Sequence, residues 1–110
     1  MALGEFEYLL ISAAATLGEN AYGVAMSEAI AKATGRTCSI GALYTTLDRL
    51  EAKGLVKTWM GGGTPQRGDR SKKMVRVTPA GTVAARSFYD TMIRISNRAP
   101  WAVQRKEGAE

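Results

Sequence analysis

The chain has 110 residues and a formal net charge of +5, with 45% hydrophobic and 23% charged residues. This composition is typical of one globular domain with a modest core. No run approaches the roughly 18 apolar residues that a membrane span requires, and no basic leader precedes a long apolar segment, so we expect neither a membrane anchor nor a signal peptide. The chain has no histidine, which excludes a Ser-His-Asp or Cys-His site and removes the commonest metal ligand. We therefore expect no enzyme activity, no metal and no cofactor.

Cys38 is the single cysteine. An internal disulfide is therefore impossible, which suits a reducing, cytoplasmic environment. Nothing places this thiol in a pair, so a small packed side chain is a better interpretation than a redox sensor. The sequence pI near 9.7 favours a polyanionic partner, either nucleic acid or an anionic membrane surface.

Apolar residues at helical spacing predict a first helix from Glu5 to Leu17, ended by Gly18. Asn20 is the expected N-cap of a second helix, and Gly35 is placed to end that helix in the left-handed conformation. The buried stripe of the second helix is predicted to contain Tyr22, Met26, Ala29, Ile30 and Ala33.

Ser39 is expected to cap a third helix that Gly54 ends. The apolar face of this helix carries Ile40, Leu43, Leu47 and Leu50. Residues 55–60 and 73–78 are rich in apolar and β-branched residues and predict the two strands of a hairpin around a polar, glycine-rich loop. Thr78-Pro79 is typical of a helix start, and this last helix should end before Pro100.

The order helix, helix, helix, hairpin, helix predicts a mainly α fold with a β-hairpin wing, a winged helix-turn-helix with an additional C-terminal helix. The core is expected to contain Leu10, Leu17, Ile30, Leu43, Leu47 and Leu50. We expect residues 1–78 to form the DNA-binding part and residues 79–104 a dimerisation helix of the same compact domain. Residues 105–110 are expected to be a frayed tail.

The outer face of the third helix has the properties of a DNA-reading surface. Steps of about 100° per residue place Gly41 and Thr45 opposite the leucines, where small side chains allow close approach to a major-groove floor. Thr45 is expected to touch a base edge, and the Tyr44 hydroxyl and the amides next to Ser39 are expected to reach phosphates. Alternatively, this is an ordinary solvated face, since Asp48 and Glu51 oppose a phosphate surface.

The positive charge is concentrated in the expected wing. Residues 61–76 hold five basic residues against one acid, 5 − 1 = +4 out of the total of +5. Arg67 and Arg70 fall in its expected loop of Gly, Thr, Pro and Ser, where they could follow a DNA backbone or enter a minor groove. Lys32 and Arg36 could extend the same surface. The glycine run 61–63 lacks the Gly-Lys-Ser/Thr ending of a nucleotide cradle.

The last helix has an apolar face that the small core can cover only in part. Phe88, Met92 and Ile95 lie on it, Trp101 follows just beyond, and Phe6 of the first helix can contribute to the same interface. A second copy of the chain is the simplest partner, and a two-fold pair of recognition helices can read a near-palindromic site at a separation of about 34 Å. The alternative is that the last helix folds back on the first helix of its own chain.

Three blocks then carry a family resemblance. AYGVAMSEAIAKATGR at 21–36, SIGALYTTLDRLEAKGLV at 39–56 and TPQRGDRSKKMVRVTPAG at 64–81 resemble the PadR family of bacterial transcriptional regulators, over a match from about Tyr8 to Ala85. The resemblance implies a winged helix, a dimer formed through the terminal helices, and repression of transcription that a small molecule or a stress signal relieves. It assigns DNA contacts to Ser39, Gly41, Tyr44, Thr45, Arg67, Arg70, Lys72 and Lys73.

In some short members of the family an aromatic residue of the last helix lines an effector pocket at the dimer interface, and the resemblance points here to Trp101 together with Met92. The chain departs from the family pattern in three places. Ile40 stands where proline is frequent, MVRV replaces paired tyrosines in the return strand, and Pro100 shortens the last helix.

The sequence thus predicts a cytoplasmic, homodimeric DNA-binding repressor of a near-palindromic operator. One alternative is a winged-helix module for protein–protein interaction whose basic wing serves solubility. The other is a small enzyme, which the lack of histidine and of an acidic pair disfavours.

Overall fold

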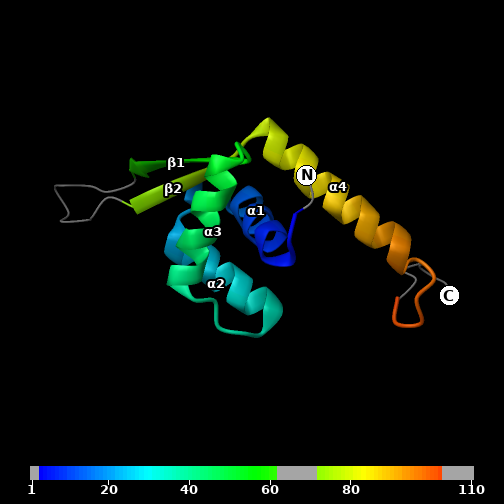
Figure 1. Ribbon diagram of the computed structural model, residues 1–110. Coiled ribbons are helices and arrows are strands. Elements are labelled where there is room, and N and C mark those ends of the chain that lie inside the picture. Colours follow the sequence, from blue (N-terminus) through cyan, green and yellow to red (C-terminus); the bar gives the residue numbers. More distant parts are fainter. Residues whose placement is uncertain (1–2, 62–71, 103–110) are drawn as a thin grey trace.

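The computed structural model describes residues 3–61 and 72–102. Three helices form the body, a two-stranded hairpin leaves it on one side, and a long fourth helix leaves it on the other (Figure 1). The molecule is therefore elongated, with extents of 56 × 29 × 22 Å. The elements are α1 (Glu5–Leu17), the 3-10 turn η1 (Gly18–Asn20), α2 (Gly23–Thr34), α3 (Ile40–Ala52), β1 (Val56–Gly61), β2 (Lys72–Val77) and α4 (Pro79–Ser96).

The predicted helix ends are confirmed, with one exception at the start of α2. Gly35 ends α2 at φ 74°, and Gly54 follows α3 at φ 78°. Asn20 was expected to cap α2, which is wrong, because Asn20 lies in η1 and Tyr22 is the N-cap residue. Ala21 is held in an extended conformation, and its carbonyl oxygen accepts the Val75 N–H at 2.9 Å. Pairing with β2 thus delays the start of the helix to Gly23.

The core lies between α1, α2, α3 and the hairpin. Its side chains with less than 2% exposure are Leu10, Ile11, Met26, Leu43, Leu47, Leu50 and Val56. Of the other residues expected inside, Ile30 is buried and Leu17 is half-buried, whereas Ala33 and Ile40 are exposed. Ala33 and Ile40 lie in the terminal turns of α2 and α3, beyond the zone where the helices cross.

The hairpin is antiparallel, with a register that runs from Val56 opposite Val77 to Gly61 opposite Lys72. Tyr22 forms a bridge to Met74 on the other edge of β2. The outer strand β1 is tied to α3 because the Glu51 carboxylate accepts hydrogen bonds from the Thr58 N–H at 3.3 Å and the Thr58 hydroxyl at 2.9 Å. The Glu51 side chain thus links the wing to the third helix.

The start of α4 is fixed at a corner where two turns meet. The Thr78 hydroxyl donates to the Gly54 carbonyl at 2.7 Å, and the Thr78 N–H donates to the Leu55 carbonyl at 3.0 Å. The same hydroxyl accepts the Gly81 N–H at 3.0 Å, as expected of an N-cap. Farther along, the ring of Phe88 stacks on Tyr8 of α1 with centroids 4.5 Å apart.

Beyond this stack, α4 leaves the body (Figure 1). The architecture is the predicted winged helix-turn-helix. None of the helices that the structure describes is long and apolar enough to cross a membrane.

Candidate nucleic-acid interface

The third helix exposes the small residues that the sequence singled out. The Ser39 hydroxyl accepts the Ala42 N–H at 3.3 Å and so caps α3. Gly41 and Thr45 are exposed, and a Cβ added at Gly41 would meet only the Ser39 hydroxyl oxygen, at 3.8 Å. This leaves the first turns of α3 free of bulky side chains on their outer side. A groove floor could approach that backbone closely.

Tyr44 is half-buried on the flank of α3, next to the start of α2. A Cβ at Gly23 would overlap the Tyr44 hydroxyl oxygen and would lie 2.8 Å from its ring carbon Cζ. The tyrosine thus needs a glycine at position 23. The Lys73 ammonium lies 5.8 Å from the centroid of the Tyr44 ring. Tyr44 therefore lies between the first turn of α2 and the start of β2.

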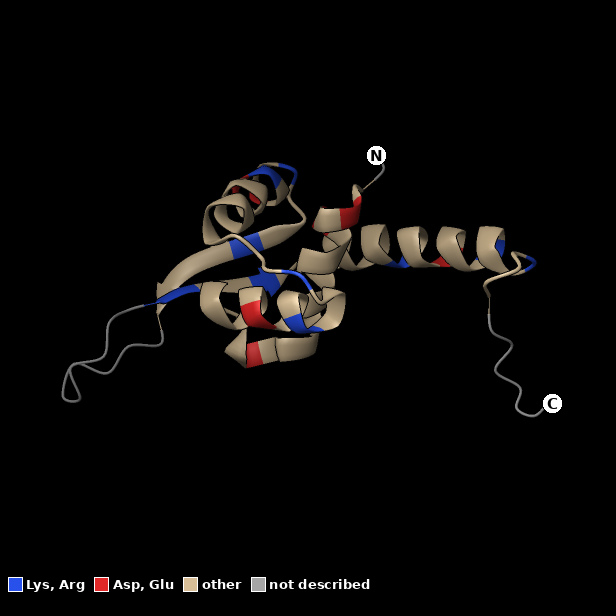
Figure 2. Ribbon diagram, turned by 90° about the horizontal axis from the view of Figure 1, so that it is seen from below, with Lys and Arg blue, Asp and Glu red and all other residues tan. Residues whose placement is uncertain are grey.

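The basic residues of β2 each lie over an aromatic ring. The Lys72 ammonium is 4.3 Å from the ring centroid of Tyr22, and the Arg76 guanidinium carbon is 5.5 Å from that of Trp59. In Figure 2 basic residues, coloured blue, occur along the hairpin, including the end that adjoins the grey segment. Such cation–π contacts orient the charged groups and remove little water from them.

The sequence reasoning gave Tyr22 only a place on the buried stripe of the second helix and passed over Trp59, because a cation–π pair between separate elements leaves no local pattern. The predicted contacts of Arg67 and Arg70 lie outside the described residues.

The cation at Lys73 has a second neighbour. Its ammonium lies 3.7 Å from Asp48 Oδ1, and the two side chains are 32% and 71% exposed. An exposed pair of this kind contributes only about 0–1 kcal/mol to stability. Its importance is its position, since it joins the wing to the outer face of α3.

A carboxylate inside the fold anchors the end of α3. Glu7 Oε1 accepts the Gly4 N–H at 2.9 Å, and Glu7 Oε2 lies 2.8 Å from the Lys53 ammonium. These two contacts, the backbone hydrogen bond first, lower the pKa of Glu7 below its ordinary value of 4.5 against the opposing effect of burial. The residue is only 9% exposed. The pair ties α1 to the residue that follows α3.

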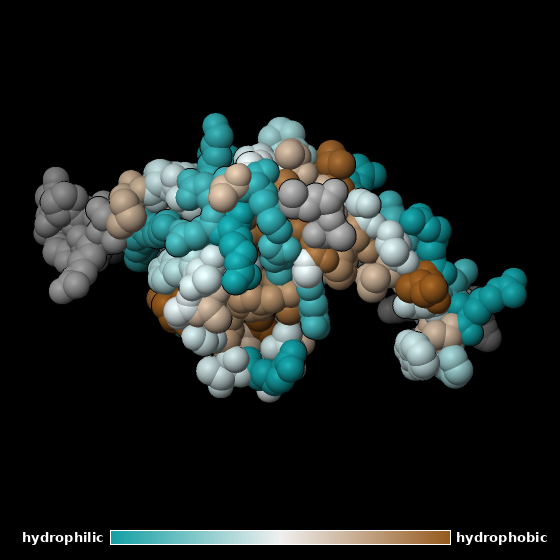
Figure 3. Space-filling view, viewed as in Figure 1, coloured by the Kyte–Doolittle hydropathy of each residue, from teal (hydrophilic) through white to brown (hydrophobic). Residues whose placement is uncertain are grey.

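The fourth helix carries an extensive apolar surface. Phe6 and Phe88 are half-buried, whereas Met92 is 43% and Ile95 75% exposed. Hydrophobic side chains interrupt the hydrophilic surface along α4 (Figure 3). Other exposed apolar residues of α4 are Val83, Tyr89 and Ile93, and the sequence reasoning passed over the last two. They occur on more than one side of the helix, so a single-stripe reading of the sequence could not single them out.

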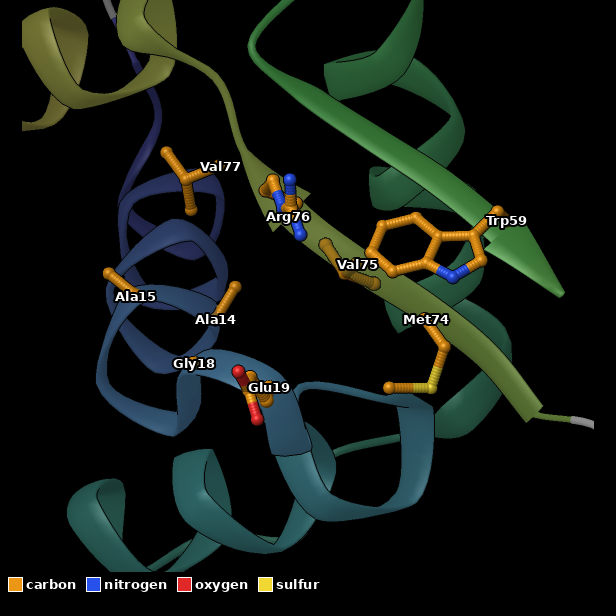
Figure 4. A pocket seen from close by; sticks show the side chains of 9 residues that line it. All are labelled: Ala14, Ala15, Gly18, Glu19, Trp59, Met74, Val75, Arg76 and Val77. Carbon is orange, nitrogen blue, oxygen red and sulfur yellow. The ribbon is translucent and has the colours of Figure 1, made fainter. Parts of the chain in front are cut away.

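A hollow of about 480 Å³ lies between α1 and the wing (Figure 4). Trp59 and Met74 lie across from Ala14 and Ala15, and the charged side chains of Arg76 and Glu19 also line it. The residues expected to form an effector pocket are not part of this lining. Met92 and Trp101 instead lie on the outer surface, and Trp101 is 78% exposed.

Comparisons with known proteins agree with this geometry. Residues 14–87 match the model of the transcriptional regulator PadR-like family. A complex of hsRosR-S1 is similar at a TM-score of 0.66 and 24% identity, over 87% of this chain and 78% of that one. A PadR family transcriptional regulator from Eggerthella lenta is similar at a TM-score of 0.64 and 24% identity, over 84% and 80%.

A complex of hsRosR-S4 is also similar, at a TM-score of 0.59 and 24% identity, over 92% of this chain and 77% of that one. No curated protein matches the sequence. At 24% identity, the likeness to these solved structures shows the fold alone. The family model shows more, because it matches most of the chain, from the last residues of α1 into α4. The chain belongs to the PadR-like family of transcriptional regulators.

Proposed function

We propose that the protein represses transcription by binding a near-palindromic operator as a homodimer. The observation that carries this proposal is the exposed, small-residue face of α3 beside the cations at the start of β2. Gly41 and Thr45 supply that face, and Lys72 and Lys73 supply the adjacent positive charge. Family membership supports regulation through DNA.

In this proposal α3 enters the major groove, the usual place of a recognition helix. Thr45 contacts a base edge or a thymine methyl group, and Gly41 allows the helix backbone to come close. Because the Ser39 oxygen accepts the bond from Ala42, its hydroxyl proton remains available for a phosphate. Tyr44 lies farther from the groove floor, at the side of α3, where its ring positions Lys73.

The wing contacts the flanking phosphates. Lys72 and Lys73 follow each other along β2, so they point to opposite faces of the strand, toward Tyr22 and Tyr44 respectively. They would therefore grip the backbone from the two sides of the wing. Arg67 and Arg70, nearer the tip in sequence, add further phosphate contacts in the proposal.

A second copy of the chain would cover the exposed side chains of α4. Large apolar side chains such as Met92, Ile93 and Ile95 remain on the surface of a helix about 27 Å long. An exposed apolar surface of this extent is typical of a protein–protein interface. Two-fold pairing would place two recognition helices on one side of the duplex, at a separation near one helical turn.

In this proposal a signal releases the operator through the connection between α4 and α3. The corner at Thr78 joins α4 to the turn after α3 through the Gly54 carbonyl. A ligand or modification that changes the angle of α4 at the interface would thus change the separation of the two α3 helices and weaken operator binding. Met92 and Trp101 are the residues proposed to sense such a ligand.

Selection from random-sequence duplex DNA tests the proposal. We expect an inverted repeat among the selected sequences, and an affinity that falls on the order of 10³-fold between about 50 and 200 mM salt if six or more phosphates are contacted. An Ile95→Glu variant should lose the dimer in sedimentation and lose preference for the paired half-sites. The matched variant Asn97→Glu places the same charge on an exposed polar position about 160° around the helix from Ile95, and it should keep the dimer.

Weak binding without an enriched motif would refute DNA recognition and favour the protein-interaction module. A monomeric protein that still selects single half-sites would refute only the dimer.

A further inference from the structure

Asp48 is an acid on the surface proposed to face DNA. Gly41, Thr45 and Asp48 are four and three residues apart and are all exposed, so they form one continuous stripe of α3. A carboxylate at this position repels phosphates of any sequence. Asp48 therefore weakens DNA binding unless a group of the bound DNA sequence interacts favourably with its carboxylate.

The position of Lys73 changes what this acid does. With Asp48 Oδ1 at 3.7 Å and the Tyr44 ring at 5.8 Å, the lysine is confined between α3 and β2. The pair carries no net charge, so Lys73 offers less attraction to an arbitrary phosphate than a free lysine would. The Asp48 carboxylate lies on the outer side of α3, where its side chain remains 71% exposed. The ion pair thus reduces the attraction of this part of the protein to DNA phosphates, which does not depend on the DNA sequence.

We propose that Asp48 is a specificity-determining residue that reads a cytosine. The proposal rests on the DNA-binding function above. In the major groove a cytosine presents its N4 amino group, a hydrogen-bond donor, and a carboxylate is the acceptor that matches it. Asp48 lies about 4.5 Å along the helix axis from Thr45, which is close to one base-pair step. Besides the ion pair with Lys73, the carboxylate therefore gains a hydrogen bond from the DNA only where a C·G pair lies next to the base that Thr45 contacts.

The test compares Asp48→Ala with Glu19→Ala. Glu19 is an exposed acid of η1 that lines the hollow beside α1, so the control removes the same charge outside the proposed interface. Affinities are measured for an unrelated duplex and for the sequence selected by the wild-type protein, and the selection is repeated with each variant.

Asp48→Ala should bind the unrelated duplex about threefold more tightly, the effect of one charge about 6 Å from a phosphate in water. It should lose about tenfold in the ratio of specific to unrelated binding, together with the preference for C·G at one position of each half-site. Asp48→Asn should move that preference toward adenine, because the amide pairs with adenine N6 and N7. Glu19→Ala should change none of these quantities.

The outcomes separate the two proposals. If the wild-type protein selects no sequence, the DNA-binding function itself fails. If the wild-type protein selects an operator and Asp48→Ala keeps the same motif and the same affinity ratio, only the role of Asp48 is refuted. Asp48→Asn keeps nearly the same side-chain size. If the selection with this variant returns the wild-type motif, the role of Asp48 is refuted as well.

Discussion

The corner between the wing and α4 predicts a large cost for the substitution Gly81→Ala. Gly81 is buried in the first turn of α4. A Cβ there would overlap the carbonyl oxygen of Leu55 and lie 2.8 Å from Val77 Cγ1. The carbonyl cannot move away freely, because it accepts the Thr78 N–H at 3.0 Å and adjoins Gly54, whose carbonyl accepts the Thr78 hydroxyl.

The magnitude follows from three contributions. Inserting a methyl group into a packed site costs about 1–3 kcal/mol, and weakening the hydrogen bond to Leu55 costs about 1 kcal/mol more. Alanine in place of glycine inside a helix returns at most about 1 kcal/mol. The net loss in unfolding free energy should be about 2 kcal/mol. For a domain of this size that corresponds to a decrease of about 10 °C in the melting temperature.

Thermal and urea unfolding, followed by circular dichroism at one protein concentration, measure this loss. Gly41→Ala is the matched control, since its Cβ meets nothing closer than 3.8 Å. That variant should be more stable than the wild type by about 0.5–1 kcal/mol. If Gly81→Ala proves as stable as the wild type, the corner is not tightly packed and the reasoning from its geometry is wrong.

Three further predictions concern the body and the wing. Glu7→Gln should lower the unfolding free energy by about 1 kcal/mol at pH 7. The folded-state pKa of Glu7 lies below 4.5, so this contribution is present above that pH and lost as the pH falls through the folded pKa; a difference that persists in urea unfolding at pH 2 would contradict it. Lys72→Gln should reduce the slope of log affinity against log salt by about 0.9, and an unchanged slope would place Lys72 away from phosphates. Gly23→Ala should cost about 1–3 kcal/mol in thermal unfolding because it displaces Tyr44. The same substitution in a Tyr44→Ala background should be close to neutral, and an equal cost in both backgrounds would show that the tyrosine is not the obstacle.

The residues that join the wing to the body explain why a hairpin with few core side chains keeps a fixed direction. Val75 is buried, and its N–H is paired with the Ala21 carbonyl. Glu51 holds the outer strand to α3 through Thr58. Each tie crosses between elements that are separate in the chain. A wing fixed in this way can present its cations at a constant distance from α3.

Much of the fold was predictable from short stretches of sequence. Gly35 and Gly54 mark helix ends because the left-handed conformation at those points suits glycine. Ser39 and Thr78 mark helix starts because a hydroxyl can accept an amide hydrogen bond within the same turn. The apolar spacing of Leu43, Leu47 and Leu50 fixes the buried side of α3 and hence its outer side. These signals depend on three or four neighbouring residues, so they can be recognised in the sequence without the rest of the structure.

Other features depend on contacts between distant parts of the chain. The start of α2 was misplaced because pairing of Ala21 with β2 overrides the capping signal of Asn20. The ion pair of Glu7 with a residue 46 positions later and the need for glycine beside Tyr44 have no local signature either. The sequence alone therefore determined the helices, the hairpin and the family. The packing of α3, β2 and the start of α2 decided which rings hold the cations of the wing, because only the tertiary structure brings those segments together.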